Sequence, residues 1–373
     1  MNSKIRVGVL FGGKSSEHEV SLLSAKNVIA GLDRSKYEVV LLGIDKQGGW
    51  HLQDEADYLL NGQDPKQIAL KNSDSIINIV PSQTSAPIQL DSALSNQNKI
   101  GALDVVIPVL HGPNGEDGTV QGLLKLLDIP FVGAGILGSS IGMDKDIMKR
   151  LLRDAGLPIG KFITLYRESK SFLTYEEAAA EVGDIIFVKP ANAGSSVGVS
   201  KVKNKSDYQM AVTEAFRWDR KILLEQFIPG REIECAVLGN FEPIASIPGE
   251  IIPTHEFYSY EAKYLDENGA KAEIPANLPK EVVKKVQELA IQTFKTLQCE
   301  GLGRVDVFVN SSFEIYINEI NTLPGFTNIS MYPKLWEASG IGYTELLDRL
   351  IGLALSRNEE EKRSVTSFKY SSK

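Results

Sequence analysis

The clearest indication of chemistry lies in a predicted hairpin that spans residues 303–321. Side chains alternate along a strand with a period of two, so Arg304 and Asp306 share one face, and Glu319 and Asn321 also share one. If the hairpin turns at its midpoint, Asp306 lies opposite Glu319 and Arg304 lies opposite Asn321. Directly opposed side chains have Cβ atoms about 4.5–5.5 Å apart. The pattern therefore predicts a compact group of two carboxylates, an amide and a guanidinium.

Two carboxylates and an amide oxygen placed this closely repel one another unless a cation lies between them. Oxygen-only ligands suit Mg²⁺, which commonly bridges protein carboxylates to nucleotide phosphates. With its turn at Ser312-Phe313, the hairpin is therefore a candidate metal site. An exposed polar sheet face with a cross-strand pair of arginine and carboxylate explains the same pattern, and the hairpin alone does not choose between the two.

A second candidate is the segment Lys189–Gly198, KPANAGSSVG, which joins one predicted strand to another. Its small residues would let backbone N–H groups approach phosphate oxygens, and Lys189 would add a point charge. Such a loop could cover a nucleotide and exclude water. The alternative is a flexible hairpin loop, and an isolated Gly-Ser segment is more often such a loop than a nucleotide-binding one.

Further polar residues follow two other predicted strands. Glu225 could accept a hydrogen bond from the exocyclic amine of adenine and Glu232 from ribose hydroxyls, although charged residues near a strand end are usually only solvated. His111 ends another strand, at the edge where a doubly wound sheet binds ligands, and is a candidate for substrate contact. Glu116 and Asp117, which follow it, are interpreted as caps of the next helix.

One apparent motif is rejected. Residues Gly8–Ser15, GVLFGGKS, match the P-loop pattern GxxxxGK[ST]. A P-loop needs its first glycine at the end of a strand, with the next four residues wrapping the phosphates. Here Gly8 lies inside a predicted strand, and three of those four residues are apolar. We expect a strand that ends at Phe11, followed by a turn at Gly12-Gly13.

The amino-terminal third must position some of these groups, and its apolar pattern alternates between strands and helices. Strands are predicted over residues 5–11, 37–44 and 104–110, and helices over residues 19–32 and through residues 120–127. Ser16 and Glu19 match a capping box ahead of the first helix. The polar segment from His51 to Lys99 is predicted to be irregular. The alternation predicts a mainly parallel sheet that binds ligands beyond the carboxyl ends of its strands.

The rest of the chain mixes strands and helices after a predicted linker at residues 133–138. Besides the hairpin, strands are predicted to end at residue 189 and to span residues 199–202, 223–226 and 232–238, and helices to span residues 145–154, 280–297 and 346–355. A long loop is predicted between Thr254 and Leu278. Beyond Ser356, the charged, serine-containing tail is predicted to be disordered.

The composition excludes several classes of protein. Among 373 residues, 40 Lys and Arg against 48 Asp and Glu give a net charge of −8, which argues against nucleic-acid binding by bulk positive charge. At roughly 150 residues per domain, the length predicts two or three domains. No apolar segment reaches the roughly 18–20 residues that span a bilayer, and residues 7–11 are too short for a secretory signal. Cys235 and Cys299 form no disulfide framework or zinc spacing, so a cytoplasmic protein is expected.

Together these segments resemble an ATP-grasp ligase, and within that group the D-alanine–D-alanine ligase family. The resemblance covers nearly the whole chain, and four segments carry most of it in the family's order. They are Ser16–Ser21 (SEHEVS), His111–Gly122, Tyr260–Tyr264 (YEAKY) and Gly303–Gly325. The polar segment that ends at Lys99 is similar to the longer N-terminal form of the family, and no site residue is placed there.

The resemblance implies a three-domain fold of the α/β and α+β classes. Residues 1–133 would form an N-terminal parallel-sheet domain that binds the first D-alanine, and residues 134–228 and 229–355 would form the central and C-terminal ATP-grasp parts. The reaction implied is the joining of two D-alanines, with ATP, through a D-alanyl phosphate, for peptidoglycan synthesis. A homodimer is also implied. Ligases that join D-alanine to D-lactate or D-serine are the alternative within the family, and Tyr264 favours the dipeptide-forming members.

The resemblance further assigns roles around ATP and the metal ions. Asp306, Glu319 and Asn321 would hold two Mg²⁺ ions, for which Mn²⁺ could substitute. The ATP-binding residues implied are Lys145, Lys189, Ser196, Glu225, Phe227 and Glu232. The lysines would contact phosphates, together with Lys263, and the two glutamates would contact adenosine.

The remaining assignments concern D-alanine and the transferred acyl group. Arg304 and the backbone N–H of Gly325 would stabilise the oxyanion. Glu17 would hold the first ammonium group, His111 would lie beside the first D-alanine, and Ser330 would bind the second carboxylate. Tyr264 and Ser195 would bond to Glu17 and close a loop over the site. Each residue also has a structural alternative: Ser330 as a helix cap, Lys263 as a solvated lysine, Tyr264 as surface packing.

Two other classes of protein remain to be compared with a ligase. A P-loop phosphotransferase would need Lys14 for nucleotide binding, whereas the ligase needs Lys189. A non-catalytic nucleotide-binding protein would bind ATP without releasing phosphate when D-alanine is added. The paired carboxylates Asp306 and Glu319 argue against that class, because a protein without chemistry does not need them.

Overall fold

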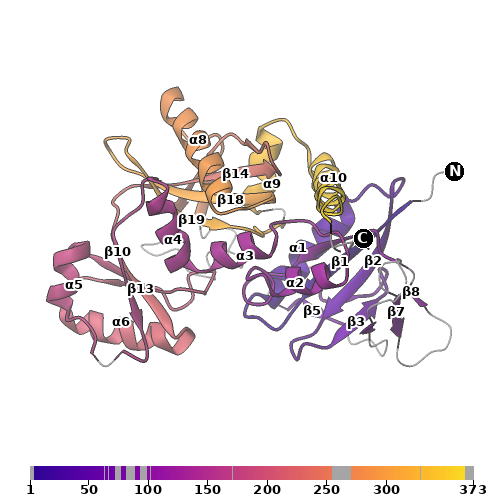
Figure 1. The fold of residues 1–373 in the computed structure, drawn as a ribbon, viewed down its shortest axis with the longest axis horizontal. Helices are drawn as coiled ribbons and strands as arrows, with labels where there is room; N and C mark the ends of the chain where they lie inside the picture. Colours follow the sequence, from indigo (N-terminus) through magenta and orange to yellow (C-terminus); the bar gives the residue numbers. More distant parts are fainter. Residues whose placement is uncertain are drawn as a thin grey trace, which may run out of the picture.

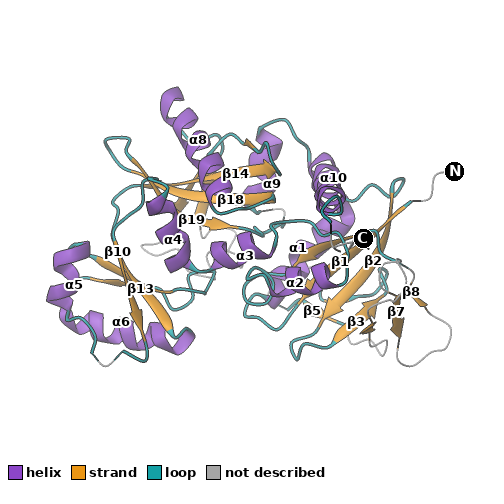
Figure 2. Cartoon of the chain, viewed as in Figure 1, coloured by secondary structure: helices purple, strands orange, loops and turns teal. Residues whose placement is uncertain are grey.

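The computed structural model describes residues 4–365, except 63, 66, 72–76, 81–88, 93–98, 101, 170, 254–269 and 328. Three groups of strands and helices follow one another along the long axis of the molecule (Figure 1). At one end lies the sheet with α5 and α6, in the middle the sheet with α8 and α9, and at the other end the N-terminal sheet. Figure 2 shows that each group combines helices with strands.

The N-terminal sheet has the strand order β3-β2-β1-β9, and the predicted parallel core is confirmed. Its elements are β1 (Ile5–Gly12), α1 (His18–Gly31), β2 (Tyr37–Ile44), β3 (Trp50–Gln53), β9 (Val105–Val109) and α2 (Thr119–Leu126). Gly8 lies inside β1, as expected, so the residues after it cannot wrap a phosphate as a P-loop. The predicted capping box is wrong: Glu17 is the N-cap residue of α1, and no side chain caps it.

The segment from His51 to Lys99 contains more regular structure than predicted. Beyond the end of β3 it carries β4 (Leu59–Leu60), β5 (Ala69–Leu70), β6 (Ile77–Val80), β7 (Gln89–Ser92) and the start of β8 (Lys99–Ile100). These strands form a two-stranded and a three-stranded antiparallel sheet. Strands of two to four residues carry too few alternating side chains to produce a readable pattern, which explains why the sequence pointed to an irregular segment.

The second group forms an antiparallel sheet of order β10-β13-β11-β12. Its elements and the helices before it are α3 (Ile136–Met143), α4 (Lys145–Asp154), β10 (Phe162–Tyr166), α5 (Tyr175–Val182), β11 (Ile186–Pro190), β12 (Ser200–Val202), α6 (Lys205–Trp218) and β13 (Lys221–Gln226). The predicted bounds of α4 are confirmed. The predicted linker at residues 133–138 is wrong in its second half, because α3 already begins at Ile136.

The third group is a larger antiparallel sheet of order β17-β16-β14-β18-β19. Its elements are β14 (Arg231–Gly239), β15 (Ile244–Ala245), β16 (Gly249–Pro253), β17 (Ala270–Glu273), α8 (Lys280–Thr296), β18 (Gly301–Val309), β19 (Ile315–Asn321) and α9 (Met331–Ala338). The predicted loop 254–278 is therefore interrupted by β17, which pairs with β16. Its first part, residues 254–269, lies outside the described residues.

The hairpin of β18 and β19 has the predicted register. Asp306 pairs with Glu319 and Arg304 with Asn321. A bulge between Asp306 and Val307 then shifts the register by one residue, so that Val307 pairs with Ile317. The bulge leaves Asn318 as the extra residue on β19, which the alternation of the sequence did not predict.

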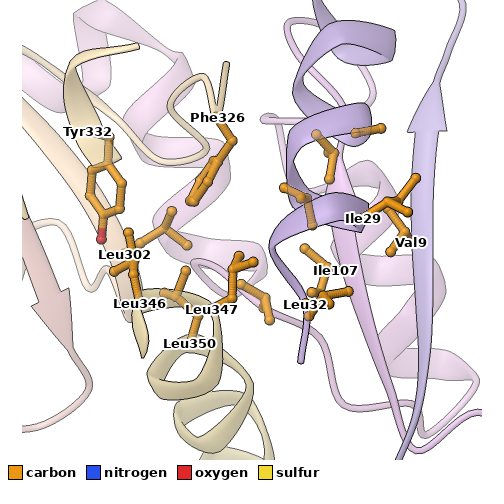
Figure 3. Packing of buried hydrophobic residues seen from close by; sticks show 14 of the residues in the cluster. Val9, Ile29, Leu32, Ile107, Leu302, Phe326, Tyr332, Leu346, Leu347 and Leu350 are labelled. Carbon is orange, nitrogen blue, oxygen red and sulfur yellow. The ribbon is translucent and has the colours of Figure 1, made fainter. Parts of the chain in front are cut away.

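Helix α10 (Tyr343–Glu361) joins the third group to the first through buried apolar contacts. In Figure 3, Leu346, Leu347 and Leu350 of α10 face Leu302 on one side and residues of α1 and β9 on the other. Buried Arg357 adds hydrogen bonds of 2.6 and 2.7 Å to the carbonyl oxygens of residues 133 and 131. Residues 356–361 are therefore helical rather than a disordered tail, and residues 366–373 lie outside the described part. None of the described helices is long and apolar enough to cross a membrane.

Candidate active site

A cleft of about 840 Å³ lies where the three groups of elements meet. Of the sequence-predicted site residues, those that line it are Glu17, His111, Lys145, Lys189, Ser195, Ser196, Glu225, Phe227, Glu232, Arg304, Glu319, Asn321, Gly325 and Ser330. The structure thus gathers residues from positions 17 to 330 into one cavity. Lys263 and Tyr264 fall outside the described residues, so their predicted roles have no structural counterpart here.

Three carboxylates lie side by side across β14, β18 and β19, and we call them the acidic row: Glu234, Asp306 and Glu319. Asp306 pairs with Glu234 on one side and with Glu319 on the other. Glu234 and Asp306 are 4% and 2% exposed, so water screens little of their repulsion. One oxygen each of Glu232, Glu234 and Asp306 lie within 4.8 Å of one another. Such a row needs cations beside it.

Arg304 supplies one of these cations. Its Nε and one terminal nitrogen each donate to a different oxygen of Asp306, both at 2.7 Å. The Nε atom also lies 3.0 Å from Glu234 Oε2. Asn321 completes the group by donating from Nδ2 to Asp306 Oδ2 at 2.9 Å. Arg304 is therefore paired with carboxylates, as the alternative interpretation expected, but its partners are Asp306 on its own strand and Glu234 on β14 rather than a carboxylate across the hairpin, and Arg304 lines the cleft instead of an exposed sheet face.

The predicted metal ligands fit a hard divalent cation by the chemistry of their donors. Asp306, Glu319 and Asn321 all carry oxygen donors and lie at adjacent positions of one hairpin. Arg304 already donates to both oxygens of Asp306, so a metal ion would share this carboxylate with the guanidinium. Lys145 Nζ lies 3.4 Å from Glu319 Oε2. The hairpin can therefore hold a metal beside lysines that attract anions.

A second charged group lies at the ends of β11 and β13. Lys189 donates to Glu225 Oε2 at 2.9 Å and lies 3.4 Å from Asn318 Oδ1, the residue at the bulge. Lys149 Nζ lies 3.5 Å from the other oxygen of Glu225. Burial opposes the charged form of each group. For Glu225, the charges of the two lysines outweigh the effect of burial, so its pKa is lowered. For Lys189, the charges of Glu225 and Glu319 outweigh the effect of burial, so its pKa is raised.

Two aromatic rings and a cation form the neighbouring wall of the cleft. The rings of Phe187 and Phe227 lie with their centroids 5.9 Å apart. Lys201 Nζ lies over the Phe227 ring, 4.5 Å from its centroid. Glu232 lines the same cavity from β14. An apolar wall beside carboxylates suits a flat heterocycle attached to a hydroxylated sugar.

The loop between β11 and β12 bends over this cleft. Ser195 and Ser196 have positive φ angles of 52° and 60°, a region that non-glycine residues rarely adopt. Ser195 Oγ donates to Glu17 Oε1, and Lys145 Nζ donates to the carbonyl oxygen of Ala193 at 2.9 Å. These contacts connect the loop to α1 and to α4, so the predicted partnership of Ser195 and Glu17 is present.

Glu17 and His111 lie on the N-terminal side of the cleft, and both are about 5% exposed. His111 Nε2 lies 3.0 Å from Ser24 Oγ, and its Nδ1 lies 3.7 Å from Glu116 Oε1. Burial lowers the pKa of His111, but the carboxylates of Glu116 and Glu17 raise it by more, so the net shift is upward. Gly112 has φ 75°, and a Cβ there would lie 2.5 Å from Glu17 Oε2.

The interpretation of Glu116 as a helix cap is wrong. Helix α2 begins at Thr119 with Gly118 at its N-cap, and Glu116 turns toward His111 in the cleft. Burial and the charge of Glu17 raise the pKa of Glu116. Asp117 does act locally, because it accepts hydrogen bonds from the backbone N–H groups of Thr119 and Asn114 at 3.0 and 2.9 Å.

Gly325 and Ser330 lie in the segment between β19 and α9, and this segment borders His111, because His111 Nδ1 lies 3.2 Å from the carbonyl oxygen of Leu323. Ser330 is the N-cap residue of α9, but its side chain does not cap the helix. Instead, Ser330 Oγ accepts from the backbone N–H of Thr327 at 3.0 Å and lies 2.8 Å from Thr327 Oγ1. A Cβ on Gly325 would come within 2.8 Å of Ser330 Oγ, so the glycine lets the backbone approach the hydroxyl closely.

Sequence reasoning missed three charged groups in or beside the cleft. Lys149 lies four residues after Lys145 on α4, a spacing that places both on one helix face. Glu234 lies two residues after Glu232 on β14, a spacing that places both on one strand face. Glu116 gave no such signal, because the turn that aims it at His111 is irregular.

Models of a known protein family match both parts of the chain. The model described as "D-ala D-ala ligase N-terminus" matches residues 6–134, and "D-ala D-ala ligase C-terminus" matches residues 151–352. A curated D-alanine–D-alanine ligase from Oceanobacillus iheyensis is 53% identical over 365 residues, which cover 98% of this chain and 99% of the relative.

Solved structures give the same result for the fold. The D-alanine–D-alanine ligase from Coxiella burnetii aligns with a TM-score of 0.83 and 38% identity, over 96% of each chain. The VanG D-Ala:D-Ser ligase from Enterococcus faecalis aligns with a TM-score of 0.80 and 36% identity, over 94% of this chain and 100% of that one. The fold is thus similar to that of ligases whose names give different second substrates, whereas the curated relative at 53% identity is a D-alanine–D-alanine ligase.

Proposed function

Because this chain belongs to the D-alanine–D-alanine ligase family and joins two D-alanine molecules with the energy of ATP, we propose a specific role for each group in its cleft. The dipeptide serves cell wall synthesis. The observation that carries the proposal is the convergence of Lys145, Lys189, Arg304 and two members of the acidic row, Glu234 and Glu319, on one cavity, with Asp306 held directly behind Arg304. Activation of a carboxylate by ATP requires neutralisation of phosphate charge, close positioning and exclusion of water.

The adenosine end of ATP is proposed to lie between β13 and β14. Phe227, with Phe187 beside it, provides the apolar wall for adenine. Glu225 accepts from the exocyclic amine, and Glu232 accepts from ribose hydroxyls. The lowered pKa of Glu225 supports this role, because an ionised carboxylate is the stronger acceptor.

The phosphates are proposed to lie over the loop and the lysines. Lys145 and Lys189 meet the phosphate oxygens, with Ser196 from the loop and Lys263 by sequence resemblance. Asp306, Glu319 and Asn321 hold two divalent ions, which we propose to be Mg²⁺, with Mn²⁺ as a substitute; such ions neutralise phosphate charge when bound. Lys189 keeps its charge in the buried site because the neighbouring carboxylates raise its pKa.

The acyl-transfer step is proposed to occur between Arg304 and Gly325. An oxygen of the first D-alanine carboxylate attacks the γ-phosphorus, ADP leaves, and an acyl phosphate forms. The amine of the second D-alanine then attacks the carbonyl carbon and loses a proton, and phosphate departs with the oxygen that made the attack. Arg304 and the backbone N–H of Gly325 stabilise the negative charge that develops on the carbonyl oxygen.

The two amino acids are proposed to be held by two neighbouring groups of residues, which border each other where His111 contacts the segment before Gly325. Glu17 receives the ammonium group of the first D-alanine, with His111 beside it. Ser195 holds Glu17 in place, and Tyr264 is assigned the same task by sequence resemblance. Ser330 binds the carboxylate of the second D-alanine, since its hydroxyl lies directly beside Gly325.

The protein is proposed to be a homodimer located in the cytoplasm. A homodimer follows from the family resemblance, and the exposed apolar side chains Leu126, Ile136 and Leu137 on α2 and α3 offer a surface for it. Light scattering on the purified protein should give twice the chain mass. The cytoplasm is the proposed location because ATP is available there.

An isotope experiment tests the proposed route. D-alanine labelled with ¹⁸O in its carboxylate is incubated with the enzyme, ATP and Mg²⁺, and the products are analysed by mass spectrometry. The acyl phosphate route transfers one labelled oxygen to inorganic phosphate for each dipeptide formed. Label found in AMP would mean activation at the α-phosphorus and would contradict the proposal, as would unlabelled phosphate beside labelled dipeptide.

A further inference from the structure

Arg304 and the proposed metal ions compete for the same carboxylate, that of Asp306. Both carboxylate oxygens of Asp306 accept from the Arg304 guanidinium at 2.7 Å, and Oδ2 also accepts from Asn321. Each oxygen offers two lone pairs, so Oδ2 already holds two donors and Oδ1 holds one. A divalent ion on Asp306 must therefore displace a donor from Oδ2 or bind Oδ1 directly beside the charged guanidinium, and in either case the two cations compete. An arginine drawn away in this manner needs another carboxylate to hold it, because its side chain is only 19% exposed.

Glu234 is placed to hold it. Its Oε2 lies 3.0 Å from Arg304 Nε, and its side chain is 6% exposed. It lies directly opposite Asp306 on the neighbouring strand, so the guanidinium can pass from one carboxylate to the other without leaving the sheet face. The proposed chemistry requires Arg304 to aim at the acyl group instead of Asp306, and Glu234 provides the anchor on the opposite side from Glu319.

We infer that Glu234 is a positioning residue that draws Arg304 off Asp306 when the metal site fills, and so promotes metal binding and aims the guanidinium at the reacting acyl group. The inference rests on the proposed metal site. Charge balance supports it: Glu234 and Asp306 share one guanidinium without the metal, and each has its own cation once a divalent ion is bound. Without Glu234, Arg304 stays on Asp306 and competes with the ion.

The test measures metal affinity and not turnover. Mn²⁺ is titrated into the full-length protein with ADP, and free Mn²⁺ is followed by electron paramagnetic resonance. We expect Arg304→Met to tighten Mn²⁺ binding by about tenfold, because a competing cation is removed, and Glu234→Gln to weaken it by about tenfold. In the double variant, Glu234→Gln should have little further effect, because it acts through Arg304.

The double variant separates this role from two others. Glu234 could instead be a metal ligand, or act only as a negative charge through space. In either case Glu234→Gln would weaken Mn²⁺ binding as strongly in the Arg304→Met background as in the wild type, and the inference would be wrong. Unchanged affinity in the single variant also overturns it. If the wild-type protein binds no Mn²⁺ beyond that bound by ADP alone, the proposed metal site fails first.

Two controls address folding and general charge effects. Glu250→Gln removes a similarly buried carboxylate on β16 that pairs with Arg231, 2.8 Å away, and should change Mn²⁺ affinity less than about twofold. Glu234→Asp keeps the charge and should recover part of the affinity that Glu234→Gln loses. Thermal unfolding of every variant shows whether the fold is retained. If Glu234→Gln does not fold, Glu234→Asp is compared with and without Arg304→Met, and its smaller loss of affinity should likewise disappear in the Arg304→Met background.

Discussion

The two walls of the cleft are built in different ways. On one wall, Asp306, Glu319 and Asn321 project from paired strands, and backbone hydrogen bonds set which side chains lie opposite each other. On the other, Ser195 reaches Glu17 from a loop in which it has a positive φ angle. The strands can hold mutually repelling charges at close range, whereas loops beside a cleft commonly open to admit substrate and close to exclude water. We therefore expect changes on the strand wall to abolish chemistry, and changes on the loop wall to reduce its efficiency.

The largest effect is expected at Glu319. Glu319→Gln preserves volume but removes a charge from the proposed metal site, so we expect phosphate release to fall by a factor of about 100 or more with the fold intact. Glu314→Gln, at the exposed end of the same hairpin, is the matched control and should retain activity. Near-normal turnover in Glu319→Gln would contradict the metal assignment and remove the contrast between the walls.

The next largest effect separates the ligase from a P-loop enzyme. Lys189→Met removes the buried cation between Glu225 and the phosphates, and ATP binding measured by calorimetry should weaken by about 10- to 100-fold. Lys14→Ala changes an exposed lysine and should leave ATP binding unchanged. The reverse result would favour the P-loop that Gly8 argues against.

A smaller effect is expected on the loop wall. Ser195→Ala removes the hydroxyl that donates to Glu17 and leaves the backbone in place. The loss of one hydrogen bond to a charged group predicts a decrease of about tenfold in kcat/KM for D-alanine. Ser206→Ala, on exposed α6, serves as control. A loss as large as that of Glu319→Gln would show that the loop takes part in the chemistry itself.

The smallest effect on catalysis is expected at Asp146 of α4, because this residue lies outside the cleft and a change there should alter the free energy of unfolding instead. Burial opposes its ionised form, but hydrogen bonds from Thr164 and Arg150 and the charge of Lys221 hold its pKa below the usual 3.8. A lowered carboxyl pKa stabilises the fold above the unfolded-state value, and this stability is lost as the pH falls through the folded-state pKa. Asp146→Asn should therefore cost about 1–2 kcal/mol at neutral pH.

The control for this change is Asp154→Asn, at the exposed end of α4. Urea unfolding at a series of pH values should show the difference between wild type and Asp146→Asn shrinking below about pH 4. A difference that persists unchanged at low pH would mean that packing, and not ionisation, accounts for the stability.

The contrast between regular strands and irregular turns also explains which parts of the site could be predicted from the sequence. The opposition of Asp306 and Glu319 follows from strand alternation, and the bounds of α4 follow from its caps and apolar spacing. The bulge that brings Asn318 toward Lys189 breaks that alternation and was not predictable from it. The contact of Glu116 with His111 likewise depends on an irregular turn, in which the N–H groups of Gly115 and Glu116 donate to the carbonyl oxygen of Gly112, and neither helical nor strand periodicity predicts such a turn.

The most direct test of the account is phosphate release by the purified protein with ATP and Mg²⁺, in parallel with D-alanine, with L-alanine and with no amino acid. We predict release with D-alanine alone, matched by D-alanyl-D-alanine in the product mixture. If no phosphate is released in any of the three reactions while ATP still binds, D-alanine ligation is contradicted. The pocket around Glu17, His111 and Ser330 would then be the part assigned to the wrong substrate.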